Sequence, residues 1–304
     1  QGGGTNVELS EYTPMPIKFT RIGFNDPLFV VFSSGTSGVP KCIIHRAGGV
    51  VLQHLKEHQL HCDLRPDDRL FYFTTCGWMM WNWLVSGLAS GATIVLFDGA
   101  PSYPDNDTLW QMSQDLGITH FGTSAKYIDG LRKAEWHGKA RFDLSNLRMI
   151  LSTGSVLSAR NFEYVYGAIH DTAHLSSISG GTDILSCFLL GCPILPVYAG
   201  ELQCAGLGMD VAVIDDDHKP LADGIGELIC RSPFVSQPLG LWGDDDQSRF
   251  KVEYFESVPG QWSQKDMVSR GESGGFVVHG RSDFTLNPGG VRIGTAEIYR
   301  ALED

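Results

Sequence analysis

The chain has 304 residues, and its composition narrows the class of protein before any motif is considered. Hydrophobic residues make up 42% and charged residues 19%, which is typical of a globular protein with a large core and excludes a disordered chain. The 23 Lys and Arg residues against 35 Asp and Glu residues give a net charge of −12. This charge argues against nonspecific binding to nucleic acids or anionic membranes, but it allows a small anionic ligand held by a few local cations.

The seven cysteines are scattered, form no CxxC pair, and indicate reduced thiols in the cytosol rather than disulfides or a zinc site. Gln1–Thr5 has neither an initiating Met nor a basic and apolar start, so we expect neither a signal peptide nor the true N-terminus. The stretch from Leu70 to Phe97 carries no charge, yet polar residues and glycines interrupt it. We therefore expect a buried core there instead of a membrane span.

The predicted elements begin after an irregular lead-in, residues 1–27. Leu28–Phe32 is a continuous apolar run, which predicts a buried strand. Gly48–Leu60 has helical spacing, with Val51, Leu52, Leu55 and Leu60 on one side. Further strands are expected at Arg69–Thr74, Thr93–Phe97, Ile118–Phe121, Leu147–Ser152 and His174–Ser179. The helices expected between them cover 78–89, Asp107–Leu116, Lys126–Trp136 and Asn161–Ile169. This alternation predicts an α/β nucleotide-binding unit with a mainly parallel sheet over residues 28–194.

The pattern changes in residues 195–282, where turn signals separate short strands. The strands predicted there are Leu207–Ile214, Gly226–Arg231 and Gly275–Val278. Short strands separated by turns are typical of a small antiparallel sheet or barrel. The charged and aromatic stretch from Gly240 to Gln264 is predicted to loop over the surface. Residues 283–304 begin a further unit that ends before it could bury a core.

A Ser- and Gly-rich loop between the first strand and the first helix is the strongest local motif. It runs Ser33-Ser34-Gly35-Thr36-Ser37-Gly38-Val39-Pro40-Lys41. Hydroxyls, glycine amides and one lysine are what a polyphosphate needs, although the spacing is not that of a Walker A loop. A flexible surface loop is the alternative, and we favour phosphate binding.

A second candidate loop, Ser177–Asp183, lies at the end of the last predicted parallel strand. A Thr hydroxyl at Thr182 can bond a phosphate, and the neighbouring Asp183 can hold Mg²⁺. A helix cap or tight turn is an equally good explanation when this motif is taken alone. The same two explanations stay open for Ser152–Ser155.

A third group of residues combines Asp266, Arg281 and Arg292 with Gly-rich turns. An aspartate can accept bonds from two ribose hydroxyls, and arginines can meet phosphate or ribose oxygens. Solvated charges beside a Gly turn would look similar, so only the combination of motifs favours a ligand site.

In the order in which they occur along the chain, these motifs resemble those of the adenylate-forming superfamily, which includes acyl-CoA synthetases, nonribosomal adenylation domains and luciferases. The resemblance runs from about Asp26 to the last residue. Longer strings are similar to its acetoacetyl-CoA synthetase branch, namely Thr75–Trp83, Ser177–Asp183, Leu195–Tyr198 and Thr285–Arg292. The resemblance implies an acid–thiol ligase that converts acetoacetate, ATP and CoA, with Mg²⁺, into acetoacetyl-CoA through an acyl-adenylate. The alternatives are a truncated ATP-binding protein without catalysis and a CoA ligase for another short carboxylic acid.

The resemblance also implies a role for each matching residue. Phosphate contacts would come from Ser33, Ser34, Gly35, Thr36, Ser37, Gly38, Lys41, Thr182 and Arg292. Adenine and ribose contacts would come from Gly154, Ser155, Val156, Ser177, Asp266 and Arg281. Asp183 would bind Mg²⁺, Asp283 would be the hinge, and Trp78, Gly180 and Gly181 would line the acyl pocket.

Three features qualify the resemblance. Lys265 stands where the family usually has Gly. The N-terminal part of the large domain and nearly all of the small domain, with its catalytic Lys, are absent, so we expect little synthetase activity from this polypeptide alone. Gly180 stands where acetyl-CoA synthetases carry a Trp, which predicts a longer acyl pocket and a shift toward acetate in Gly180→Trp.

Overall fold

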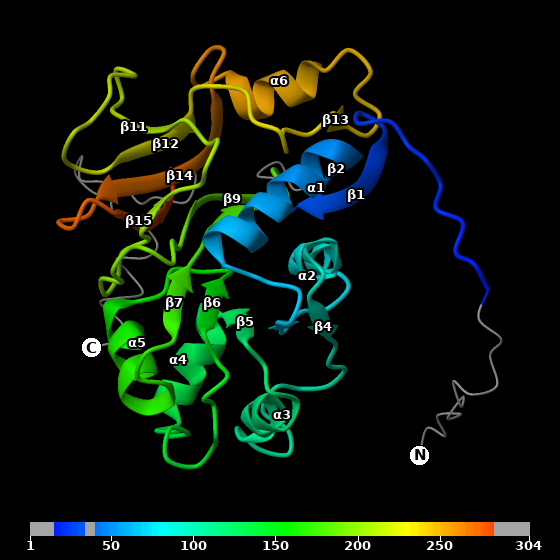
Figure 1. Cartoon of the computed structure of the whole chain (residues 1–304). Coiled ribbons are helices and arrows are strands. Elements are labelled where there is room, and N and C mark those ends of the chain that lie inside the picture. The colour runs from blue at the N-terminus through cyan, green and yellow to red at the C-terminus, as the bar shows by residue number, and fades with distance from the viewer. Residues whose placement is uncertain (1–14, 34–39, 283–304) are drawn as a thin grey trace.

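The computed structural model describes residues 15–33 and 40–282. A five-stranded parallel sheet forms its centre, in the order β4-β3-β5-β6-β7 (Figure 1). Its strands are β3 (Arg69–Tyr72), β4 (Thr93–Val95), β5 (His120–Ser124), β6 (Met149–Thr153) and β7 (His174–Ser177). The predicted α/β class with a mainly parallel sheet is confirmed.

Both faces of this sheet are covered, which explains why its strands are so apolar. On β3, Phe71 packs on one face, whereas Leu70 and Tyr72 pack on the other. The first face carries the helices α3 (Thr108–Leu116), α4 (Ala125–Lys133) and α5 (Ala159–Tyr164), the last continued by a π-helical turn, Val165–Ile169. The second face carries α2 (Met80–Ser86), continued by a 3₁₀ turn, Gly87–Ser90. In the part of the chain that the structure describes, no helix is long and apolar enough to cross a membrane.

The first strand forms as predicted, but its predicted burial is wrong. β1 (Pro27–Ser33) pairs antiparallel with β2 (Lys41–Arg46), and β13 (Gly240–Leu241) completes this sheet (Figure 1). Leu28, Val30 and Phe32 are 39%, 41% and 67% exposed. The reason is that β1 is an edge strand, and a run of apolar residues does not show how many faces are covered.

The first helix is also confirmed, but the face that was predicted to be buried is wrong. α1 (Ala47–Lys56) continues as a π-helical turn, Glu57–His61, and lies between the β1–β2 hairpin and α2 (Figure 1). Three of the four residues expected on its apolar side, Val51, Leu52 and Leu60, are exposed, and the buried side is polar. It consists of Gln53, His54, Glu57, His58 and His61.

Hydrogen bonds explain how most of this polar surface is buried, although both ring nitrogens of His58 have no hydrogen-bond partner among the described residues. The Glu57 carboxylate accepts from Gln53 Nε2 at 2.8 Å, from Trp83 Nε1 at 2.9 Å and from the Ser186 hydroxyl. Buried polar groups are tolerated when such partners are present. The periodicity of apolar residues cannot reveal these partners, because they come from α2 and a distant strand.

Two antiparallel sheets build the second half. β11 (Val211–Ile214), β12 (Gly226–Cys230), β14 (Trp262–Arg270) and β15 (Phe276–Arg281) pair in that order. β8 (Ser179–Gly181), β9 (Ser186–Leu190) and β10 (Cys204–Ala205) form the other sheet. Of the two predicted forms, the antiparallel sheet is confirmed. Among the described residues the four-stranded sheet stays open between β11 and β15 and forms no closed barrel.

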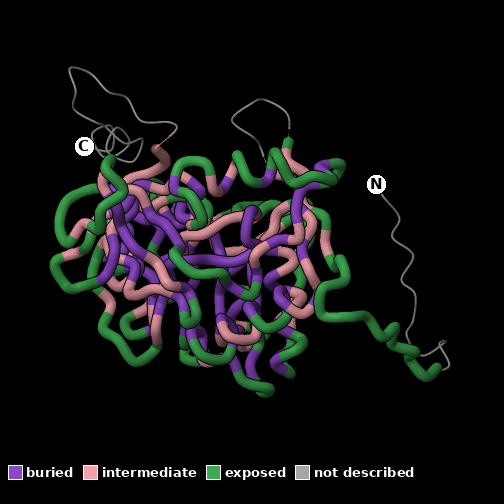
Figure 2. The backbone as a smooth tube through the Cα atoms, turned by 90° about the horizontal axis from the view of Figure 1, so that it is seen from above, coloured by how far each residue is buried: buried purple, intermediate pink, exposed green. Residues whose placement is uncertain are grey.

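The stretch from Gly240 to Gln264 is not a surface loop, contrary to the prediction. It contains β13 and the helix α6 (Ser248–Phe255), which buries Phe250 and Tyr254. The Tyr254 ring stacks on Trp262, with 4.0 Å between ring centroids. Figure 2 shows buried segments through the interior of the fold and exposed ones around its rim.

Candidate functional site

The predicted adenine loop lies where two parallel strands end. Ser152 on β6 pairs with Ser177 on β7, and the Thr153 hydroxyl donates to the Ile178 carbonyl at 2.9 Å. Gly154 follows with φ at +89°, and a Cβ added there would lie 3.5 Å from the Trp78 ring. The structure therefore brings Gly154, Ser177 and Trp78 to one edge of the sheet, where open α/β sheets bind ligands.

A cluster of charged residues joins the predicted phosphate loop to the predicted metal ligand. Lys41 Nζ lies 2.5 Å from Asp183 Oδ1 and 3.0 Å from Glu253 Oε1. The Tyr254 hydroxyl donates to the same Asp183 oxygen at 2.6 Å. The side chains of Lys41, Asp183 and Glu253 are only 12%, 11% and 23% exposed. We call these four residues the Lys41 cluster.

The elements of the cluster come from distant parts of the chain. Lys41 begins β2, Asp183 follows the short strand β8, and α6 supplies Glu253 and Tyr254. Burial, together with the Asp183 carboxylate, raises the pKa of Tyr254, so the phenol stays protonated and donates. Sequence analysis missed Glu253 and Tyr254, although the spacing of Phe250 and Tyr254 is that of one helix face.

His45 fixes the backbone beside the cluster. Its Nε2 lies 3.0 Å from the Thr182 carbonyl oxygen, and the residue is fully buried. Burial lowers the pKa of His45 to about 4, so the imidazole is neutral at pH 7 and donates through Nε2. No sequence motif pointed to His45.

The low pKa of His45 predicts that the folded protein loses stability as the pH falls. Its folded pKa of about 4 lies below the ordinary 6.5, so the unfolded chain takes up the proton first as the pH falls. The contribution of neutral His45 to the free energy of unfolding is therefore complete above pH 6.5 and falls as the pH decreases towards 4. At pH 5 this contribution has fallen by about 2 kcal/mol. We expect His45→Gln to reduce the fall in Tm between pH 7.5 and pH 5 by about 3 °C in thermal melts. His218→Gln, at an exposed histidine, is the control, and equal pH slopes for both variants would contradict the prediction.

The predicted ribose ligand lies next to the cluster. Asp266 on β14 is the register partner of Arg281 on β15, and its Oδ2 accepts from Gln264 Nε2 at 2.8 Å. A Cβ added to Gly181 would lie 3.6 Å from Asp183 Oδ2 and 3.8 Å from Gln264 Nε2. Gly181 and Gln264 therefore connect the predicted phosphate and ribose positions.

Lys265 has φ at +67°, in the left-handed region that glycine adopts without strain. This conformation gives a physical reason for a glycine at the position in the family. In this chain Lys265 lies between Ser263 and Met267 of β14, where the register with β12 shifts.

The expected role of Gly180 in the acyl pocket stays a prediction, and this residue packs closely against the neighbouring strand. A Cβ there would come within 2.1 Å of the Ser186 carbonyl oxygen and 2.3 Å of Cys187 Cα, both backbone atoms of β9. Position 180 therefore faces the neighbouring strand, and a tryptophan there would fit only if β8 and β9 moved apart. In the predicted phosphate loop, Ser33 is the last residue of β1 and pairs with Lys41, the first residue of β2. Ser34–Gly38, Asp283 and Arg292 lie outside the described residues.

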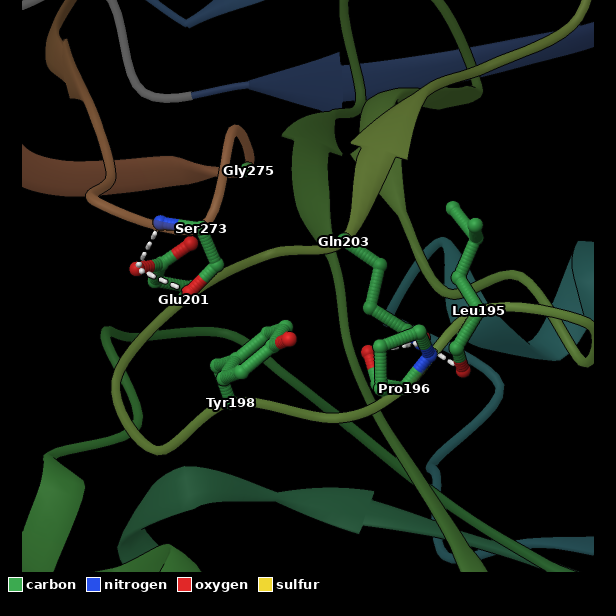
Figure 3. A pocket seen from close by; sticks show the side chains of 7 residues that line it. All are labelled: Leu195, Pro196, Tyr198, Glu201, Gln203, Ser273 and Gly275. Atoms are coloured by element: carbon green, nitrogen blue, oxygen red, sulfur yellow. Dashed lines mark hydrogen bonds between the residues drawn. The ribbon is translucent and has the colours of Figure 1, made fainter.

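One pocket of about 100 Å³ lies away from these residues (Figure 3). It opens between the 195–203 segment and the β14–β15 turn, and most of its polar side chains form hydrogen bonds with other groups of the protein. Gln203 Nε2 donates to the carbonyl oxygens of Leu195 and Pro196, at 2.8 and 2.9 Å, and the Ser273 hydroxyl donates to Glu201 at 3.1 Å. This pocket includes no predicted site residue.

The comparisons with known proteins agree with this geometry. Residues 7–238 match the family model described as AMP-binding enzyme, and the chain belongs to that family. Over its whole length it is 52% identical to acetoacetyl-coenzyme A synthetase of Rhizobium meliloti (strain 1021), of which it covers 47%. Over 94% of its length it is 46% identical to acetoacetyl-CoA synthetase of Mus musculus, of which it covers 43%.

Solved structures are similar as well. Acetoacetyl-CoA synthetase from Streptomyces lividans matches 97% of this chain with a TM-score of 0.89 and 44% identity, over 46% of its own length. The anthranilate CoA ligase AuaEII shares the fold, with a TM-score of 0.79 and 22% identity over 93% of this chain and 52% of its own. The chain thus spans about half the length of the relatives it matches.

Proposed function

We propose that the protein activates acetoacetate with ATP and transfers the acyl group to CoA. The observation that carries this proposal is the contact between Lys41 and Asp183, two predicted phosphate and metal residues 142 positions apart. The similarity to acetoacetyl-CoA synthetases supports the choice of acid. We expect the reaction to take place in the cytosol, in keeping with seven free cysteines.

The proposed chemistry has two steps. An oxygen of the acid attacks the α-phosphorus of ATP, the bond to pyrophosphate breaks, and an acyl-adenylate forms. The CoA thiol then attacks the acyl carbonyl carbon, loses its proton, and displaces AMP. Because two anions approach in the first step, cationic and donor groups must offset the developing charge. Lys41 supplies a cation, and the Thr182 hydroxyl is proposed to contact the α-phosphate.

The cluster fits a magnesium ion that also binds substrate phosphates. Mg²⁺ is usually held by one or two carboxylates together with phosphate oxygens. Asp183 supplies one carboxylate, and the described residues contain no group of three or more His, Cys, Asp or Glu side chains that could hold a metal without substrate. When bound, the ion would neutralise phosphate charge. Asp183 is proposed as its ligand.

The other predicted residues keep their proposed roles. Adenine would lie against Gly154, Ser155 and Val156, with Ser177 near its amino group. Ribose would meet Asp266 and Arg281, and the acyl group would lie near Trp78 and Gly181. Asp283 is proposed as the hinge, and Arg292 as a phosphate contact.

The test is a substrate panel with the full-length protein. We expect pyrophosphate release that depends on acetoacetate, and thioester formation when CoA is added. The kcat/KM for acetate should be at least about tenfold lower, because a longer pocket leaves the smaller acid poorly held. Preference for another acid would correct the substrate alone. ATP binding without turnover of any acid would favour a noncatalytic nucleotide-binding protein.

A further inference from the structure

The Lys41 cluster holds more negative than positive charge. One ammonium lies between two carboxylates, Asp183 and Glu253, so one negative charge is left over. Lys41 Nζ also lies 5.1 Å from the centre of the Tyr254 ring. Because these side chains are largely buried, their attraction is screened less than that of a surface ion pair.

One carboxylate oxygen of Asp183 accepts two hydrogen bonds. Its Oδ1 accepts from both Lys41 and Tyr254, at 2.5 and 2.6 Å. An ammonium held this close to the carboxylate stands where a divalent cation would approach it. A divalent cation that binds Oδ1 would therefore have to displace Lys41 from Asp183.

Glu253 is the residue that opposes this movement. It binds Lys41 from α6, on an element distinct from those of Lys41 and Asp183. We propose that Glu253 is a positioning residue that holds Lys41 across Asp183 and thereby weakens the binding of magnesium nucleoside triphosphates. The inference rests on the proposed function, since it takes Lys41 and Asp183 as the groups that meet the nucleotide.

Calorimetric titration of the full-length protein with MgATP, in the absence of any acid substrate, tests the inference. Glu253→Gln removes the attraction for Lys41 in the free protein while keeping the size of the side chain. We expect its Kd for MgATP to fall about fivefold. Its Kd for adenosine should not change, because a ligand without phosphates does not require Lys41 to move. A purely structural role would alter both affinities.

The matched control is Glu256→Gln, which removes an exposed carboxylate at the end of the same helix. It should change the Kd for MgATP less than 1.5-fold, on the order expected for a distant screened charge. A gain equal to that of Glu253→Gln would show a general charge effect and overturn the inference. Weaker or unchanged MgATP binding by Glu253→Gln would overturn it too.

A double-mutant cycle shows whether the effect passes through Lys41. In a Lys41→Gln background, Glu253→Gln should no longer tighten MgATP binding. Where Lys41→Gln binds too weakly for titration, thermal unfolding without ligand gives the same comparison, because Glu253→Gln should lower the midpoint only when Lys41 is present. Equal effects in both backgrounds would refute the proposal. If the wild-type protein does not bind MgATP, the proposed function fails first, which separates the two failures.

Discussion

Asp183→Asn in the full-length protein is expected to lower acetoacetate-dependent ATP–pyrophosphate exchange at least about 100-fold. The amide keeps the shape of the side chain and can still accept from Tyr254, so the fold should persist. It removes the charge that is proposed to hold the metal, and losing one preorganised charge contact to a transition state typically costs a factor of 10² to 10³. The initial exchange rate, measured over a range of Mg²⁺ concentrations, is the readout.

Asp217→Asn is the control, because its side chain is 77% exposed and lies in a turn outside the site. It should leave the exchange rate within about twofold, since an exposed charge is screened by solvent and salt. An Asp183→Asn variant that keeps a third or more of the wild-type rate would show that Asp183 has no metal role. Unchanged circular dichroism is needed to separate loss of chemistry from loss of structure.

The two carboxylates on Lys41 are thus expected to act in opposite directions. Removing the charge of Asp183 should impair the reaction, whereas removing that of Glu253 should tighten nucleotide binding. A cluster that served only to hold α6 in place would lose stability in both variants and show no opposite signs. The pair of variants therefore distinguishes a functional cluster from a structural one.

The sequence predicts the parallel sheet well because four of its five strands, β3, β5, β6 and β7, are buried on both faces. A continuous apolar run such as Met149–Leu151 then has one good explanation. The same reasoning fails at Leu28–Phe32, where an equally apolar run lies at an edge. It fails again on α1, where buried His54 and Glu57 are satisfied by partners from distant elements. Burial depends on those partners, and periodicity carries no information about them.

Some residues of the proposed site could be selected from the sequence because they lie in characteristic local strings. Lys41, Asp183 and Asp266 lie in motifs with characteristic neighbours, and the structure places them around Gly181 and Gln264. Glu253, Tyr254 and His45 belong to no such string. They reach the site because α6 and β2 pack there, which only tertiary structure reveals.

Gly180→Ala is expected to destabilise the full-length protein by about 3 kcal/mol or more and to lower its Tm by about 5 °C. The added methyl group would meet the Ser186 carbonyl oxygen and Cys187 Cα, and backbone atoms cannot rotate aside as a side chain can. Since Thr182 and Asp183 lie in the connection between β8 and β9, exchange activity should fall with the stability. Thermal unfolding followed by circular dichroism measures the first effect.

Gly181→Ala is the matched control, because its Cβ would meet nothing closer than 3.6 Å. Its Tm should stay within about 2 °C of the wild type, as expected for a contact of ordinary van der Waals length. Equal stability of the two alanine variants would mean that β8 can move away from β9. Only in that case could a tryptophan at position 180 be accommodated and turn toward the acyl group. The relative stability of these two variants therefore decides whether a residue at 180 can control the length of the acyl pocket.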